Sequence, residues 1–127
     1  MAVSLGSEPP RALEAQRMLE LADYDVRKGS PANTRCVYVD DEHVGFYVLH
    51  RNYINFLYIF QPYRKRGYGR EVVAMLCLAQ PNLFLHSTPK ARTFWQQCGF
   101  VVRVQDKDEQ GRACVEMARP NIQHMAG

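Results

Sequence analysis

The stretch RKRGYGRE, residues 64–71, joins an apolar run to a helical pattern, and this junction constrains the fold of the chain most. YINFLYIF, residues 53–60, has the β-branched and aromatic composition of a strand. REVVAMLCLAQ, residues 70–80, has the pattern of an amphipathic helix that ends before Pro81. A strand that enters a glycine-containing loop and opens a helix presents unpaired backbone N–H groups at the positive end of the helix dipole. The junction therefore predicts a phosphate-binding site.

The charge of the chain supports this prediction. Four of its 16 Lys and Arg residues lie in the stretch: Arg64, Lys65, Arg66 and Arg70. The formal net charge is +3, and without these four cations it would be −1. The positive charge is local, which favours an anion held at one place over a nucleic-acid surface. Gly67 and Gly69 let the backbone approach the anion without a Cβ in the way.

Two common nucleotide-binding motifs do not fit the stretch. A P-loop needs Gly-Lys followed by Ser or Thr, whereas Arg70 and Glu71 follow Gly69. The dinucleotide motif lacks its third glycine, and the strands before the loop form hairpin patterns instead of a βαβ unit.

The residues before the junction predict one helix and an antiparallel hairpin. Apolar residues recur at helical spacing from Pro9 or Pro10 to about Lys28. TRCVYVD, residues 34–40, and HVGFYVLH, residues 43–50, are β-rich runs separated by two acidic residues, the pattern of a hairpin.

The residues after the junction complete the predicted fold. LFLHS, residues 83–87, predicts a short strand, and a helix is expected from Pro89 to the C-cap residue Gly99. Residues 100–105 and 113–118 predict a closing hairpin. The order α-β-β-β-α-β-α-β-β indicates an α+β (α/β) fold with a mixed, mostly antiparallel central sheet flanked by helices. We expect a single domain over residues 1–127, with a loose tail from about residue 119.

Two motifs resemble those of the GNAT superfamily of N-acetyltransferases. Residues 64–69, RKRGYG, resemble the [QR]-x-x-G-x-[GA] signature that holds the pyrophosphate of acetyl-coenzyme A in that family. Residues 91–100, ARTFWQQCGF, resemble the family's A-x-x-[FL]-Y-x-x-x-G-F helix and turn. The motifs stand at the family's usual separation, and the resemblance covers about residues 35–118.

The resemblance implies acetyl-coenzyme A as co-substrate and assigns residues to it. Ile59, on the strand before the loop, is expected to offer backbone groups to the pantetheine arm. The expected pyrophosphate cradle consists of the amides of Arg64, Lys65, Arg66, Gly67, Tyr68, Gly69 and Arg70. LFLHS is expected to splay away from YINFLYIF and leave a cleft for the thioester and the acceptor amine. The implied reaction is direct attack of a primary amine on the thioester carbonyl.

The catalytic pair of the family is not matched. Trp95 stands where the family has its general-acid tyrosine, and an indole N–H cannot protonate a thiolate. Residues 53–55 lack the glutamate that many members carry near the start of this strand. The remaining catalytic candidates are His86 as a base, Ser87 beside it, and Tyr53 as a proton donor. A strand-end histidine and a tyrosine used for packing are the alternatives for these positions.

The missing pair leaves two functions open. The first is an N-acyltransferase that acetylates a primary amine, and the second is a catalytically silent, acyl-coenzyme A-binding module with a regulatory or interaction role. One helix precedes the first hairpin where many relatives have two that wall the acceptor site, so a protein amine is favoured over a small molecule. A homodimer through the last strands is possible, and no nucleic-acid partner is expected.

Metal and membrane signals are absent from the sequence patterns. No C-x-x-C pair occurs among Cys36, Cys77, Cys98 and Cys114. His43, His50 and His124 show no metal-ligand spacing, so no metal is assigned. There is no signal-peptide pattern and no apolar run of membrane-span length. We therefore expect reduced thiols, no membrane partner and a cytoplasmic (intracellular) location.

Overall fold

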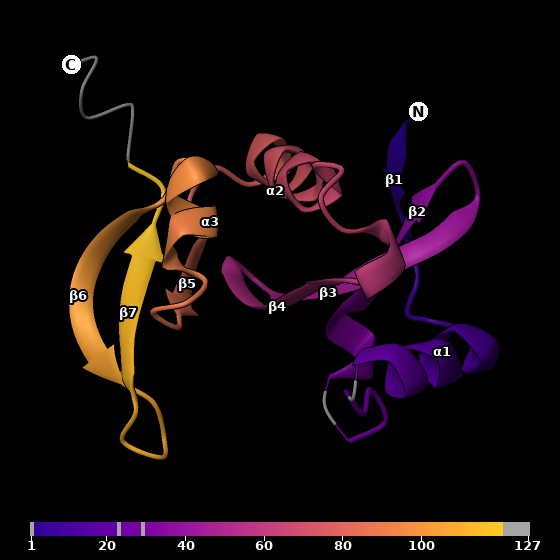
Figure 1. Ribbon diagram of the computed structural model, residues 1–127, viewed down its shortest axis with the longest axis horizontal. Coiled ribbons are helices and arrows are strands. Elements are labelled where there is room, and N and C mark those ends of the chain that lie inside the picture. The colour runs from indigo at the N-terminus through magenta and orange to yellow at the C-terminus, as the bar shows by residue number, and fades with distance from the viewer. Residues whose placement is uncertain (1, 23, 29, 121–127) are drawn as a thin grey trace. The chain divides into compact units, whose positions relative to one another are not determined.

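The computed structural model in Figure 1 describes residues 2–22, 24–28 and 30–120. The chain divides into two compact units, Met1–Val72 and Val73–Gly127. The described residues form seven strands and three α-helices. The strand pairs within each unit are antiparallel, so the predicted α+β fold with a mostly antiparallel sheet is confirmed. The single domain over residues 1–127 stays a prediction, and most of the expected tail lies outside the described residues.

The first unit contains four strands in the order β1-β2-β3-β4. Their bounds are Val3–Leu5, Thr34–Val39, Glu42–His50 and Tyr53–Ile59. The hairpin β2-β3 and the strand β4 were predicted, whereas the three-residue strand β1 was not. Asp40 and Asp41 turn the first hairpin with positive φ values of 51° and 68°, a conformation that short polar residues tolerate.

One face of this sheet packs against α1 (Ala12–Ala22). Met18 of α1 is fully buried in a cluster with Cys36 of β2, Phe46 of β3 and Phe60 after β4. Half-buried aromatic side chains extend the cluster: they are Tyr24, Tyr38, Phe56, Tyr58 and Tyr63. Burial of this apolar and aromatic face holds α1 on the sheet.

The helix predicted to run to Lys28 ends earlier, at Ala22. Asp25 accounts for part of the difference, because its carboxylate accepts the amide of Arg27 at 3.0 Å and its carbonyl accepts the amide of Lys28 at 3.1 Å. An aspartate that bonds the backbone two residues on favours a turn over a helix. Val26 is nevertheless buried in the core from this turn, and this is why its spacing matched a helix.

The second unit contains three strands in the order β5-β7-β6. Their bounds are Phe84–Ser87, Ala113–Ala118 and Val101–Lys107. α2 (Tyr68–Ala79) spans the boundary of the two units, and α3 (Arg92–Gln97) precedes β6. α3 starts after a turn in which the amide of Ala91 reaches Thr88, so Pro89 is not its first residue. Gly99, with φ of 93°, follows α3 as predicted for a C-cap glycine.

The close approach of β3 to β4 predicts a large effect of a single methyl group. A Cβ on Gly45 would lie 2.3 Å from the Tyr58 carbonyl oxygen and 3.0 Å from Ile59 Cα. Since backbone atoms cannot rotate away, we expect Gly45→Ala to lower the free energy of unfolding by about 1–3 kcal/mol, measured by urea denaturation. The matched control is Gly6→Ala, whose Cβ would find its nearest neighbour at 3.4 Å. Equal losses in the two variants would contradict this account of the β3-β4 contact.

Candidate functional site

The loop between β4 and α2 has a backbone that suits an anion. β4 is followed by the short 3₁₀ helix η2 (Gln61–Tyr63), and α2 begins at Tyr68. The loop residues Lys65 and Gly67 have positive φ values of 65° and 82°. The amide of Glu71 makes the first bond of α2, to the Gly67 carbonyl at 3.1 Å. The amides of residues 68–70 precede this bond, so they have no acceptor within the helix and lie at its positive end.

The space next to Gly67 is open, and the exposed side chains of the loop around it are cationic. An added Cβ on Gly67 would meet no atom within 4 Å. Exposed side chains surround it: they are Arg64, Lys65, Arg66 and Arg70. Tyr68, by contrast, is buried and anchors the first turn of α2, so only its amide is available to a ligand. Free amides, positive charge and room for atoms fit the phosphate groups of coenzyme A.

The side chain of Arg64 contacts the end of β4 and so links the loop to this strand. Its Nε donates a hydrogen bond to the Ile59 carbonyl at 2.8 Å. Its guanidinium carbon lies 4.8 Å from the centre of the Tyr58 ring, within cation–π range. Tyr58 is fixed in turn, because its hydroxyl donates to the Leu21 carbonyl of α1 at 3.2 Å. The Ile59 carbonyl, one of the backbone groups expected to meet pantetheine, is therefore already an acceptor in this structure.

The three catalytic candidates lie on two different strands. Tyr53 is the first residue of β4, half-buried and paired with His50 across the β3-β4 hairpin. His86 and Ser87 are consecutive residues of β5, so their side chains point to opposite faces. His86 is exposed, whereas Ser87 is 2% exposed and donates to the Thr88 carbonyl at 2.8 Å. The two side chains therefore cannot both face the expected cleft, and the catalytic roles of His86, Ser87 and Tyr53 stay predictions.

His86 has a carboxylate partner that the sequence did not reveal. Its Nε2 lies 3.3 Å from Oδ2 of Asp106 on β6. Asp106 was expected in the turn of the closing hairpin, but β6 continues to Lys107. β7 lies between β5 and β6 in the sheet. Its residue Glu116 pairs with His86, and Oε2 of Glu116 lies 3.5 Å from Nε of Arg103. The strand order brings Asp106 close to His86, and local sequence patterns do not reveal this contact.

Trp95 is a packing residue of the second unit. It is 8% exposed and makes edge-to-face contacts with Phe94 and Phe100, at centroid distances of 5.0 and 5.5 Å. Such contacts are typical of aromatic core packing. The position at which the family motif has tyrosine thus serves the core in this chain.

A family model described as an acetyltransferase (GNAT) domain matches residues 17–120. This chain belongs to the GNAT acetyltransferase family. The match includes the loop after β4, the helix after it and the closing hairpin, and it confirms the resemblance seen in the two motifs. The protein is thus an enzyme of the GNAT N-acetyltransferase family.

Solved structures of GNAT proteins share the fold. Apo YjaB from Escherichia coli has a TM-score of 0.73 at 19% identity, over 93% of this chain and 97% of that one. A GCN5-related N-acetyltransferase from Rhodopseudomonas palustris has a TM-score of 0.66 at 19% identity, over 94% and 98%. YlbP from Bacillus subtilis, in complex with coenzyme A, has a TM-score of 0.71 at 15% identity, over 94% and 98%. No curated protein matches the chain in sequence.

Two further expectations concern thiols and membranes. All four cysteines of this GNAT protein are free thiols in the structure. Among the helices that the structure describes, none has the length and apolar character needed to cross a membrane.

The left-handed backbone at Gly67 predicts a strain effect that does not depend on packing. Because an alanine Cβ would meet no neighbour there, any loss of stability in Gly67→Ala reports backbone conformation alone. We expect its free energy of unfolding to fall by about 1–2 kcal/mol. Gly67→Asn is the matched control and should lose less, since asparagine tolerates positive φ. Urea denaturation measures both, and an alanine variant as stable as wild type would contradict the loop conformation.

Proposed function

We propose that this GNAT-family enzyme binds acetyl-coenzyme A at the β4–α2 junction and transfers the acetyl group to a primary amine. The observation that carries the proposal is the start of α2, where the amides of residues 68–70 lack helical acceptors beside four exposed cations. The coenzyme A bound to the similarly folded YlbP supports this choice of ligand.

The cradle would hold the cofactor through backbone and charge together. The Arg64 amide donates to the Gln61 carbonyl at 3.2 Å. We therefore assign the pyrophosphate to the amides of residues 65–70, with the Arg64 guanidinium and the other Arg and Lys side chains balancing its negative charge. We assign the pantetheine arm to the backbone of Ile59. Since the Ile59 carbonyl accepts a bond from Arg64, an arm that pairs with this carbonyl replaces that bond. The guanidinium is then available to a phosphate oxygen.

The chemistry needs two proton transfers, and this chain offers side chains for them. Bound acetyl-coenzyme A supplies an activated thioester. The amine nitrogen forms a bond to the carbonyl carbon, the carbon–sulfur bond breaks, and the acetyl group remains on nitrogen. We assign His86, held by Asp106, to accept the amine proton, and Tyr53 to donate a proton to the departing thiolate. Ser87 is buried and donates to the Thr88 carbonyl, so we assign it to hold the end of β5 beside His86 and not to contact the reactants.

We further propose a protein amine as the favoured acceptor, a lysine side chain or an N-terminus. One α-helix, α1, precedes β2 in residues 2–22, 24–28 and 30–33, where many relatives have two. A less enclosed acceptor site suits a chain segment better than a small molecule. A screen in which only small amines are acetylated, and no peptide or protein is labelled, would overturn this preference.

Two further aspects of the function remain our proposals. A homodimer is supported by β6, the outer strand of the β5-β7-β6 set, where Val101 and Val104 are 48% and 51% exposed. A cytoplasmic location agrees with four free thiols.

The cofactor proposal predicts a ligand-dependent thermal shift. Acetyl-coenzyme A at a hundredfold excess over Kd should stabilise the folded protein by about 2.7 kcal/mol, a shift of several degrees in Tm. Gly69→Glu should abolish the shift by placing a carboxylate where phosphate binds. Its own fold should survive, since a negative charge favours a helix N-terminus. Ala74→Glu, on the exposed side of the same helix, is the charge-matched control and should shift like wild type. A shift of equal size with ATP, or none with acetyl-coenzyme A, would contradict the cradle.

The catalytic assignment predicts a loss of turnover without a loss of cofactor binding. His86→Gln should lower kcat by about 10²–10⁴-fold, measured as free thiol released in the presence of an amine acceptor. Asp106→Asn should lower kcat less and move the pH profile, because it acts through His86. Glu109→Gln, an exposed residue in the turn of the same hairpin, is the control. A wild type that binds the cofactor but releases no thiol with any acceptor tested would instead favour the silent module.

A further inference from the structure

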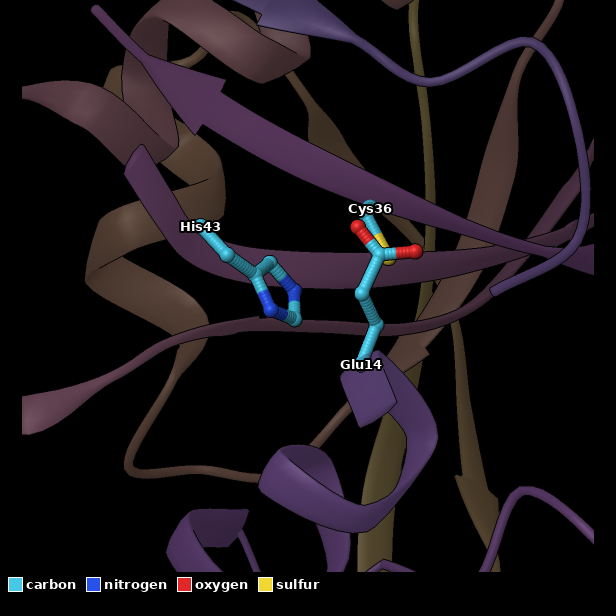
Figure 2. A group of neighbouring side chains, drawn as sticks. All are labelled: Glu14, Cys36 and His43. Carbon is cyan, nitrogen blue, oxygen red and sulfur yellow. The ribbon is translucent and has the colours of Figure 1, made fainter. Parts of the chain in front are cut away.

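A polar cluster lies beneath α1, outside the cofactor loop. Figure 2 shows Glu14, Cys36 and His43 pointing toward one another from α1, β2 and β3. One carboxylate oxygen, the thiol sulfur and one ring nitrogen all lie within 4.8 Å of one another. These are three atom types that bind transition metals, brought together from three elements.

The fold explains why the three residues meet. Cys36 and Tyr38 alternate along β2 and therefore share one face of the sheet. Tyr38 pairs with His43 across the β2-β3 hairpin. Glu14 precedes Met18 by one helical turn, and Met18 is buried against the same face. The spacing of these residues in the sequence carries no metal motif because the contact depends on the packing of α1.

The imidazole of His43 is a buried polar group without a hydrogen-bond partner among the described residues. Both of its ring nitrogens are shielded from solvent, and neither has a hydrogen-bond partner among the residues that the structure describes. A buried polar group without a partner is unfavourable and rare, and an ion is one of its ordinary explanations. The ring packs edge-on against Phe60 at a centroid distance of 5.0 Å, which holds it in place.

The side chains of Glu14 and Cys36 offer the other two ligand atoms, an oxygen and a sulfur. Glu14 accepts hydrogen bonds from the Tyr38 hydroxyl and, at 3.1 Å, from the Arg11 amide, and a carboxylate has further lone pairs for an ion. Cys36 is 2% exposed. Burial and then the charge of Glu14 raise the pKa of the Cys36 thiol to about 12, whereas burial lowers the pKa of His43.

We propose that Glu14, Cys36 and His43 bind a zinc ion. Zinc accepts this mixture of oxygen, sulfur and nitrogen ligands in tetrahedral geometry. Its bond lengths place such ligand atoms roughly 3.4–3.6 Å apart. Since the present separations do not exceed 4.8 Å, a contraction of at most about 1.4 Å completes the site. Three protein ligands leave the fourth position to water. The Tyr38 hydroxyl orients the Glu14 carboxylate from outside the coordination sphere.

The charge and proton balance of this site is simple. Binding forms a zinc–sulfur bond and breaks the S–H bond of Cys36, and the proton passes to the buffer. Carboxylate and thiolate together cancel the two positive charges of zinc, while His43 donates a lone pair as neutral imidazole. The ion joins α1 to the β2-β3 hairpin, so its effect is on the stability of the first unit. The proposal does not rest on the acetyl-coenzyme A site.

Cobalt(II) substitution tests the site directly in the full-length protein. After chelation and dialysis, Co²⁺ should bind one to one and give a thiolate-to-cobalt charge-transfer band that Zn²⁺ abolishes. Cys36→Ser should remove the band, and His43→Gln should weaken Co²⁺ binding by at least about 100-fold. Tyr38→Phe should weaken it by about 10–100-fold. Cys77→Ser, at another buried free cysteine, is the matched control and should keep the band.

Two sets of results would overturn the zinc site. One is the absence of a charge-transfer band in the wild-type protein. The other is a band that survives in both Cys36→Ser and His43→Gln, which would place the cobalt elsewhere. Cys36→Ser alters a core position, so circular dichroism is used to check that each variant is folded. If Cys36→Ser does not fold, His43→Gln alone tests the site. Zn²⁺ should also raise the Tm of the wild type and leave that of His43→Gln unchanged.

Discussion

The amides at the start of α2 have no acceptor within the helix, and the candidate cofactor site depends on this constraint. Their position is fixed from both sides. Tyr68 is buried beneath the first turn, and Arg64 ties the start of the loop to the Ile59 carbonyl. β4 is fixed in turn by its close contact with Gly45 of β3. The N–H groups at the start of α2 thus lie close to the open space at Gly67, where four exposed cations supply the charge that phosphate requires.

This chain does not carry the catalytic groups of the family motif at two positions. Trp95 contributes to the core of the second unit, and no carboxylate is present at residues 53–55. The His86–Asp106 pair is a polar contact that resembles a base with an orienting carboxylate. Because Ser87 points to the opposite face of β5, it cannot share a site with His86 through side chains alone. The residues of this chain therefore match the family's cofactor-binding motif more closely than its catalytic positions.

The sequence predicted features that depend on local chemistry. The strands around the junction, the helix after it and the glycine after α3 follow from composition, spacing and turn residues. β1 was missed because three residues carry no periodic signal, and α1 was drawn too long because Val26 reaches the core from a turn. The Asp106 partner of His86 and the Glu14–Cys36–His43 cluster were missed because strand order and helix packing create them. Such long-range contacts leave no pattern in a single sequence.

We propose that backbone amides of the loop hold the pyrophosphate of coenzyme A. An amide-resolved NMR titration of the ¹⁵N-labelled protein tests it most directly, with pantetheine as the matched ligand that lacks the pyrophosphate. The account predicts that coenzyme A shifts the amide signals of residues 65–70 strongly and that pantetheine leaves them nearly unchanged. Saturable binding of coenzyme A that leaves these signals in place would contradict the account.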